Sequence, residues 1–145
     1  MLRWAYLLIL VSTCFAQELT IRVVNAKDGK PLPKESVTVQ FLGQAAAPPP
    51  LQLHTDQTGN ARFEVPTPSP KVLSVRVVLT SEHWHCACLV MTETAKVVRD
   101  GVTQAPPSKD EPPSRSNLIA KPGEIVIVAR SFTLLEKLLY PLIKE

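Results

Sequence analysis

The chain has 145 residues, of which 16 are basic and 13 acidic, so its formal charge is only +3. This near balance excludes the class of nucleic-acid-binding proteins that rely on a concentrated basic face. Three cysteines cannot make a disulfide scaffold, so the fold must depend on an apolar core, and the length allows one domain with extra segments.

The first sixteen residues have the layout of a secretory signal. Arg3 precedes an apolar run at 4–11, and smaller residues follow as far as Ala16. The run is too short to span a bilayer. We expect cleavage after Ala16 and export to the periplasm or the extracellular space. The alternatives are lipidation at Cys14, which Thr13 disfavours because a smaller residue is usual there, and an uncleaved anchor.

From residue 17 onwards the chain consists of short apolar segments separated by turns. Residues 17–25 alternate between apolar and polar side chains, which is typical of a half-buried strand. Asp28-Gly29 predicts a tight turn, and the prolines at 48–50 predict a loop. Similar patterns predict strands at 17–25, 36–42, 51–55, 61–65, 72–79, 84–91 and 124–129, the last of them central.

Two segments have helical patterns. Residues 92–100 predict a short helix, with Thr92 as its N-cap and Gly101 just beyond its end. Residues 131–145 predict a C-terminal amphipathic helix. Its apolar stripe at helical spacing comprises Phe132, Leu135, Leu138, Leu139 and Leu142.

Short strands with frequent turns favour an antiparallel sandwich over a βαβ fold. We therefore predict a mainly β protein with an antiparallel immunoglobulin-like or transthyretin-like sandwich at 17–130. Within it, the proline-rich and charged stretch 102–121 predicts a flexible insert.

Two motifs in the first half of the chain form a recurrent pair. The turn Gly29-Lys30-Pro31-Leu32 precedes a strand with Val37-Thr38-Val39, and a hairpin runs from Thr55-Asp56 through Gly59 to Phe63. With these motifs, residues 17–80 resemble the carboxypeptidase-regulatory-like domains. The resemblance implies a transthyretin-like sandwich and a non-catalytic accessory role. The part from Trp84 onward departs from that pattern and is similar to small exported bacterial proteins, which implies no activity.

The sequence contains no recognisable catalytic motif. It has neither a Gly-x-Ser-x-Gly turn nor a glycine-rich phosphate loop. Hydroxyisourate hydrolase, an enzyme with the transthyretin sandwich, ends in Tyr-Arg-Gly-Ser, whereas this chain ends in Tyr140-Pro141-Leu142-Ile143-Lys144-Glu145. We therefore expect no enzyme activity.

The densest group of reactive side chains lies at 83–88. His83, His85, Cys86 and Cys88 offer imidazole and thiolate ligands that suit zinc or copper. On a regular strand the histidines and the cysteines face opposite sides, so all four converge only through a bulge or loop. The alternatives are a strained, easily reduced Cys86–Cys88 disulfide and a plain core role for Trp84 and the cysteines.

The leading functional hypothesis is a non-catalytic binding or interaction module of the bacterial cell envelope, with a protein or carbohydrate ligand and no nucleic acid. The first alternative is a metal-binding or redox protein that uses residues 83–88. The second is a membrane-associated envelope protein with peripheral contact through Phe132, Leu135, Leu139 and Leu142. The same stripe can instead cover one face of the sandwich.

Overall fold

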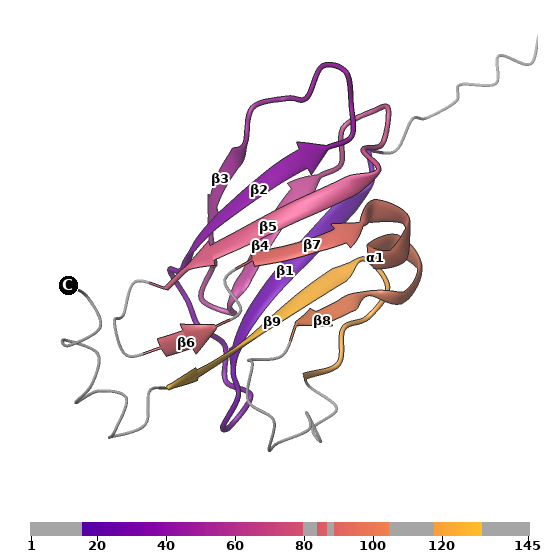
Figure 1. Ribbon diagram of the computed structural model, residues 1–145. Helices are drawn as coiled ribbons and strands as arrows, with labels where there is room; N and C mark the ends of the chain where they lie inside the picture. Colours follow the sequence, from indigo (N-terminus) through magenta and orange to yellow (C-terminus); the bar gives the residue numbers. More distant parts are fainter. Residues whose placement is uncertain (1–15, 80–83, 87–88, 105–117, 132–145) are drawn as a thin grey trace, which may run out of the picture.

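The computed structural model describes residues 16–79, 84–86, 89–104 and 118–131. These residues form two β-sheets and one short helix, and the sheets lie face to face (Figure 1). The predicted mainly β sandwich with a short helix is thus confirmed. Apart from their inner ends at Ala16 and Ser131, the predicted signal at 1–16 and the predicted helix at 131–145 lie outside the described residues.

Sheet A has the strand order β4-β1-β9-β6, with β8 also beside β9. Antiparallel pairing joins β4 to β1 and β6 to β9, whereas β1 and β8 both run parallel to β9. The central position of β9 was predicted, but its two parallel partners were not. The strands are β1 (Glu18–Asn25), β4 (Asn60–Glu64), β6 (Trp84–Cys86), β8 (Val102–Gln104) and β9 (Glu124–Ser131).

Sheet B has the strand order β3-β2-β5-β7 and is antiparallel throughout. It lies in front of β1 and β4 in Figure 1. Its strands are β2 (Ser36–Leu42), β3 (Leu51–His54), β5 (Val72–Val78) and β7 (Leu89–Glu93).

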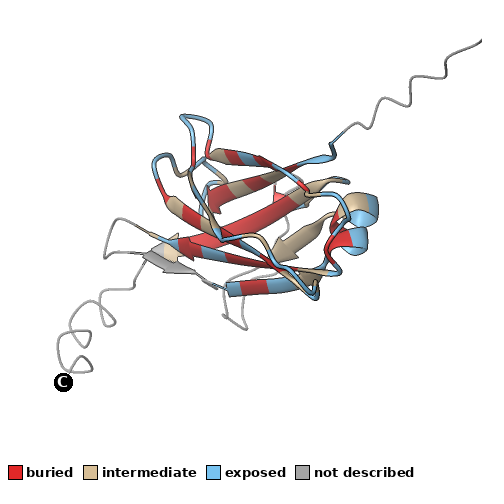
Figure 2. Cartoon of the chain, turned by 90° about the horizontal axis from the view of Figure 1, so that it is seen from above, coloured by how far each residue is buried: buried red, intermediate tan, exposed pale blue. Residues whose placement is uncertain are grey.

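The core fills the space between the two sheets. Side chains alternate across the strands, and on β1, β2, β4 and β5 every second residue points inward and is buried. Figure 2 shows these buried positions along the strands. The rings of Phe41 on β2 and Phe63 on β4 meet across the sandwich in a tilted arrangement, with centroids 6.2 Å apart. The inward residues that are fully buried are Leu19, Ile21, Val23, Val37, Val39, Leu73, Val75, Val77, Ile125 and Ile127.

A second apolar cluster covers the outer face of sheet A. It comprises Val24, Val126 and Val128 together with Leu118, and all four are at most 4% exposed. Strand β9 is therefore buried on both faces, which explains its unbroken apolar run. The predicted flexible insert at 102–121 accordingly begins with β8 and ends with packed residues; 105–117 lie outside the described part of the chain.

The single strand predicted at 84–91 was wrong, because the structure has two strands there in different sheets. β6 pairs with β9 of sheet A, and Cys86 lies opposite Ala129. β7 begins at Leu89 and pairs with β5 of sheet B. A run of apolar residues fits either sheet, so hydrophobic periodicity carries no sign of the change from one to the other.

Helix α1 (Thr94–Asp100) joins β7 to β8 at one end of the sandwich (Figure 1). Its N-cap is Glu93 rather than the predicted Thr92, and Glu93 makes no side-chain capping bond. The reason is that the β5–β7 ladder holds Thr92 extended opposite Leu73. Gly101 occupies its predicted place at the end of the helix, where its N–H bonds to Val97 O.

Candidate binding face

The outward side chains of sheet B form two rows across the strands. Register pairs place Thr38 between Gln52 and Arg76, and Arg76 beside Leu89. A second row runs from Gln40 through Ser74 to Met91. These residues face outward because their neighbours along each strand point into the core. We call this surface the outer face of sheet B.

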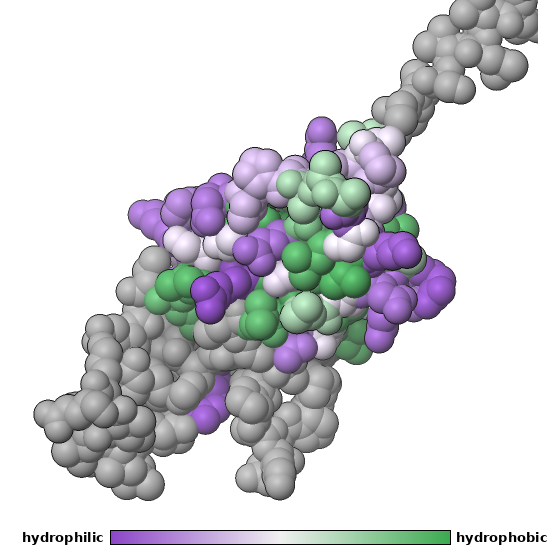
Figure 3. Space-filling model, turned by 45° about the horizontal axis from the view of Figure 1, so that its top comes forward, coloured by the Kyte–Doolittle hydropathy of each residue, from purple (hydrophilic) through white to green (hydrophobic). Residues whose placement is uncertain are grey.

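A hollow of about 520 Å³ lies on this face. Ser74 is only 6% exposed although it points outward, so it forms the floor. The face viewed in Figure 3 intersperses apolar side chains with hydrophilic ones. The residues that line the hollow are Thr38, Gln40, Leu42, Gln52, Ser74, Arg76, Leu89 and Met91.

Large apolar side chains are exposed on this face. Val78, Leu89 and Met91 are 54%, 52% and 62% exposed, and all three point outward from β5 or β7. Among the described residues, only one other large apolar side chain, Ile119, is as exposed. Apolar residues that gather beside a hollow are typical of an interaction surface, whereas single exposed ones are ordinary.

The polar groups of the hollow can donate and accept hydrogen bonds. The Thr38 hydroxyl donates to Gln52 Oε1 at 2.9 Å, which orients that amide. Arg76 is the one charged side chain among the described residues of the lining, and no ion pair or hydrogen bond joins it to another described residue's side chain. The face thus offers a cation between aliphatic walls, a setting suited to a protein partner with apolar and acidic groups.

The predicted metal site lies only partly within the described residues. His85 and Cys86 are on β6, opposite Arg130 and Ala129, while His83 and Cys88 fall outside. Within the described part, no three His, Cys, Asp or Glu side chains are grouped closely enough to hold a metal ion. The four-ligand site therefore stays a prediction. His54 lies on β3 of the other sheet, 3.3 Å from Ser36 Oγ.

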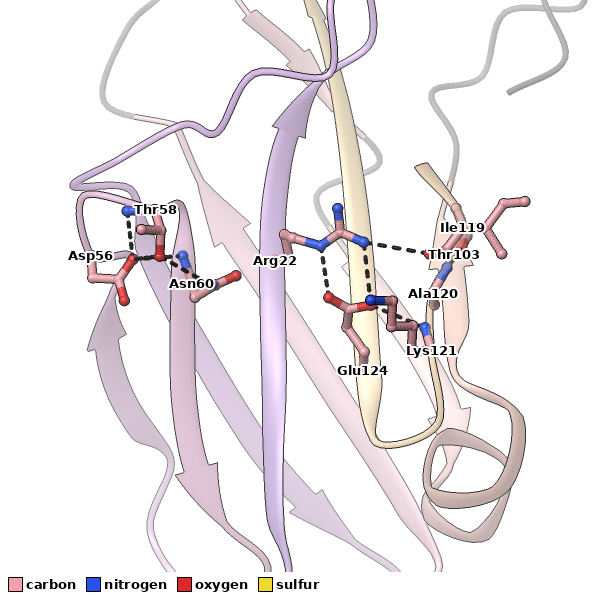
Figure 4. Close-up of polar contacts among 9 residues, drawn as sticks. All are labelled: Arg22, Asp56, Thr58, Asn60, Thr103, Ile119, Ala120, Lys121 and Glu124. Atoms are coloured by element: carbon pink, nitrogen blue, oxygen red, sulfur yellow. Dashed lines mark hydrogen bonds and ion pairs between the residues drawn. The ribbon is translucent and has the colours of Figure 1, made fainter. Parts of the chain in front are cut away.

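An ion pair holds the loop at 118–121 against the outer face of sheet A (Figure 4). Arg22 Nε lies 2.7 Å from Glu124 Oε1, and Arg22 Nη2 lies 3.2 Å from Oε2. The Lys121 N–H also donates to Glu124 Oε2 at 3.0 Å. Partial burial raises the pKa of Glu124, but these bonds and the nearby positive charges together lower that pKa below its ordinary 4.5.

The hairpin predicted at Thr55–Phe63 was wrong, because β3 and β4 lie in different sheets and do not pair. Residues 55–59 instead form a turn that connects the two sheets (Figure 4). Asp56 Oδ1 accepts hydrogen bonds from the Thr58 hydroxyl and from the N–H groups of Thr58 and Asn60 at 2.6–3.1 Å. These bonds lower the pKa of Asp56. Gly59 has φ +73°, and a Cβ there would lie 2.8 Å from Val23 O, so only glycine fits.

Sequence reasoning did not identify the outer face of sheet B as a candidate binding surface. The alternation in β5 separates the exposed Arg76 from the buried valines on either side of it, so the sequence already indicated that Arg76 points outward. Leu89 and Met91 were hidden because they had been assigned to a strand that began at Trp84. Only the pairing with β5 shows that these two side chains point outward next to Arg76.

None of the helices described is long and apolar enough to cross a membrane. The chain matches no known protein family, and a comparison with curated proteins finds no significant relative.

Proposed function

We propose that this protein is a non-catalytic interaction module of the bacterial cell envelope that binds a protein partner on the outer face of sheet B. The observation that carries the proposal is the hollow of about 520 Å³ with Leu89 and Met91, both more than half exposed, on its wall. A partner that covers these side chains removes their apolar area from water, at roughly 25 cal/mol per Å².

The lining favours a protein over a carbohydrate. Sugar rings are commonly bound by stacking on aromatic side chains, and none of the described residues that line the hollow is aromatic. Methionine and leucine adapt to the irregular apolar side chains of a protein surface. Arg76 adds a donor for a carboxylate. The partner expected here therefore presents apolar side chains with an acidic group beside them.

The shifted carboxylates support a non-catalytic role. The pKa values of Asp28, Asp56, Asp100 and Glu124 are all lowered by hydrogen bonds or cations, and for Asp28, Asp56 and Glu124 these contacts also hold turns or loops in place. A general acid at neutral pH needs a raised pKa instead. Residence in the envelope rests on the secretory layout of residues 1–16.

A photo-crosslinking side chain placed at Gln40 in living cells tests the proposal. Gln40 is exposed and lines the hollow, so we expect an adduct with a distinct envelope protein. The matched control is the same side chain at Arg62, which is exposed on β4 of the opposite sheet, and we expect no adduct there.

The partner identified in this way is then titrated against purified protein. Gln40→Glu puts a negative charge into the hollow where the partner's acidic group is expected, and we expect it to weaken binding at least about tenfold, or ~1.4 kcal/mol. Arg62→Glu should leave binding unchanged. Equal crosslinking from both faces, or adducts only between copies of this chain, would contradict the proposal.

A further inference from the structure

In the part of the chain that the structure describes, no strand pairs with the outer edge of β7. In an antiparallel ladder, the N–H and C=O of each residue point to the same side, and successive residues alternate. Thr94 N donates to Lys71 O at 3.0 Å, which continues the β5–β7 ladder by one pair. The backbones of Thr94, Thr92 and Val90 therefore face β5. Those of Leu89 and Met91, and the N–H of Glu93, face away, and no hydrogen bond among the described residues joins them to another strand.

Of the other strands that end the sheet paths β3-β2-β5-β7 and β4-β1-β9-β6, β3 and β4 carry protection that Leu89–Thr92 of β7 lacks. The prolines at 48–50 precede the four-residue β3, and β4 carries Arg62 and Glu64 on its outward side. Leu89–Thr92 of β7 contains neither charge nor proline. An edge strand of that composition is a template for pairing with another chain.

The strand that best fits this edge is β7 itself. Its outward side chains are Leu89, Met91 and Glu93, an apolar, apolar, acidic series. An antiparallel copy centred on Met91 places its Glu93 opposite Leu89, and Leu89 already lies beside Arg76. Two strand spacings of about 4.8 Å separate Arg76 from that carboxylate, a distance that the two long side chains can span. Within one copy, Glu93 lies opposite Val72, which is four residues along β5 from Arg76. Glu93 and Arg76 of the same copy are therefore not neighbours.

We propose that a second copy of this chain pairs with β7 by antiparallel strand addition, with Met91 on the two-fold axis. Each Met91 exchanges two backbone hydrogen bonds with its counterpart, and each Glu93 N–H donates to Leu89 O of the other copy. Two Arg76–Glu93 ion pairs, one on each side of the axis, set the register. Sheet B becomes one continuous eight-stranded sheet, and the two hollows lie side by side.

This inference goes beyond the proposed function, because it concerns the edge of β7 rather than the hollow, and its experiment depends on other residues. Sedimentation velocity of the purified, processed protein over a concentration series measures association directly. We expect a concentration-dependent dimer. Arg76→Glu and Glu93→Arg each turn two attractive contacts into repulsive ones, so each should weaken association about tenfold or more.

Mixing the two charge variants supplies the decisive control. In the mixed pair, each new glutamate meets a new arginine and each native arginine meets a native glutamate, so we expect the dimer to return. Arg62→Glu on β4 should leave association unchanged. Met91→Pro removes an outward N–H without touching the β5 ladder, and it should weaken association more than Met91→Ala does.

A chain that is monomeric at every concentration would overturn this inference, as would a dimer that both charge reversals leave intact. Either result leaves the proposed function standing if Gln40 still crosslinks to a distinct protein. Conversely, a charge-dependent dimer with no crosslink from Gln40 to another protein would retain the dimer and remove the broader proposal.

Discussion

Arg22 and Glu124 form the least exposed ion pair of those that the described residues make, with side chains 20% and 15% exposed. Arg22 comes from the first strand and Glu124 from the last, and Arg22 Nη2 also donates to Ile119 O at 3.4 Å. The pair thus fastens the parallel strands β1 and β9 and the loop before β9 at one point. Alternation along β1 had placed Arg22 on the outward face, but its partner 102 residues away could not be predicted.

Removing the carboxylate charge should destabilise the fold in a pH-dependent way. For Glu124→Gln we expect a loss of about 1–2 kcal/mol at neutral pH, because Arg22 loses a charged partner in a partly buried setting. The folded-state pKa of Glu124 is lowered, so its contribution is fully present above the ordinary 4.5 and disappears as pH falls through the folded value. Urea unfolding at neutral pH and near pH 3 measures both effects.

The matched control for this prediction is the exposed pair Lys30–Asp28, whose side chains are 78% and 37% exposed. Lys30→Gln should leave the free energy of unfolding nearly unchanged at either pH, because water screens such pairs. A difference between wild type and Glu124→Gln that stays constant down to pH 3 would contradict the assignment.

At the scale of elements, both ends of the stretch 102–121 are part of the folded sandwich, because β9 has apolar side chains on both faces and other residues must pack on each face. Val126 and Val128 point away from the main core, and Leu118 packs on them. The Ala120 N–H bonds to Thr103 Oγ1 at 2.8 Å, which ties that loop to β8. Composition predicted a flexible insert, because prolines and charges between 106 and 115 outnumber the few apolar residues at its ends.

Two neighbouring substitutions test whether Leu118 is structural. Leu118→Ala should lower the free energy of unfolding by about 2–3 kcal/mol, since a buried leucine is truncated and a cavity remains. Ile119→Ala, at a side chain 59% exposed, should change it by less than about 0.5 kcal/mol. Chemical denaturation measures both. Equal, small effects would mean that the second apolar cluster contributes little to stability.

For the whole molecule, the proposed signal and the folded part meet at Gln17. The Val65 N–H bonds to Gln17 O at 2.8 Å, and the β1–β4 ladder then begins at Glu18 opposite Glu64. A chain that starts at Gln17 therefore keeps every described hydrogen bond of β1. Cleavage after Ala16 would leave the sandwich intact.

Intact mass spectrometry of the protein from its native envelope fraction checks the proposed processing. We expect a denatured mass that corresponds to a chain starting at Gln17. A lipidated chain that starts at Cys14 would support the lipoprotein alternative instead. A native mass higher by one metal ion, lost on denaturation, would support the site predicted at His83, His85, Cys86 and Cys88.

The sequence by itself determined the strands that have one face in the core and the other face outward. Alternation separates buried from outward residues strictly in β2, and with the exceptions of Val24 and Ser74 in β1 and β5; that signal is local because successive side chains of a strand point to opposite sides. The turn at Asp56–Asn60 was equally local, since its hydrogen bonds span at most four residues.

Only the tertiary structure decided which strands pair and which outward side chains meet. Three features join segments that are distant in the chain. They are the parallel partners of β9, the division of 84–91 between the sheets, and the position of Leu89 beside Arg76. Such pairings depend on the closure of long loops and on which apolar surfaces remain uncovered, and neither quantity is written in the local pattern of residues.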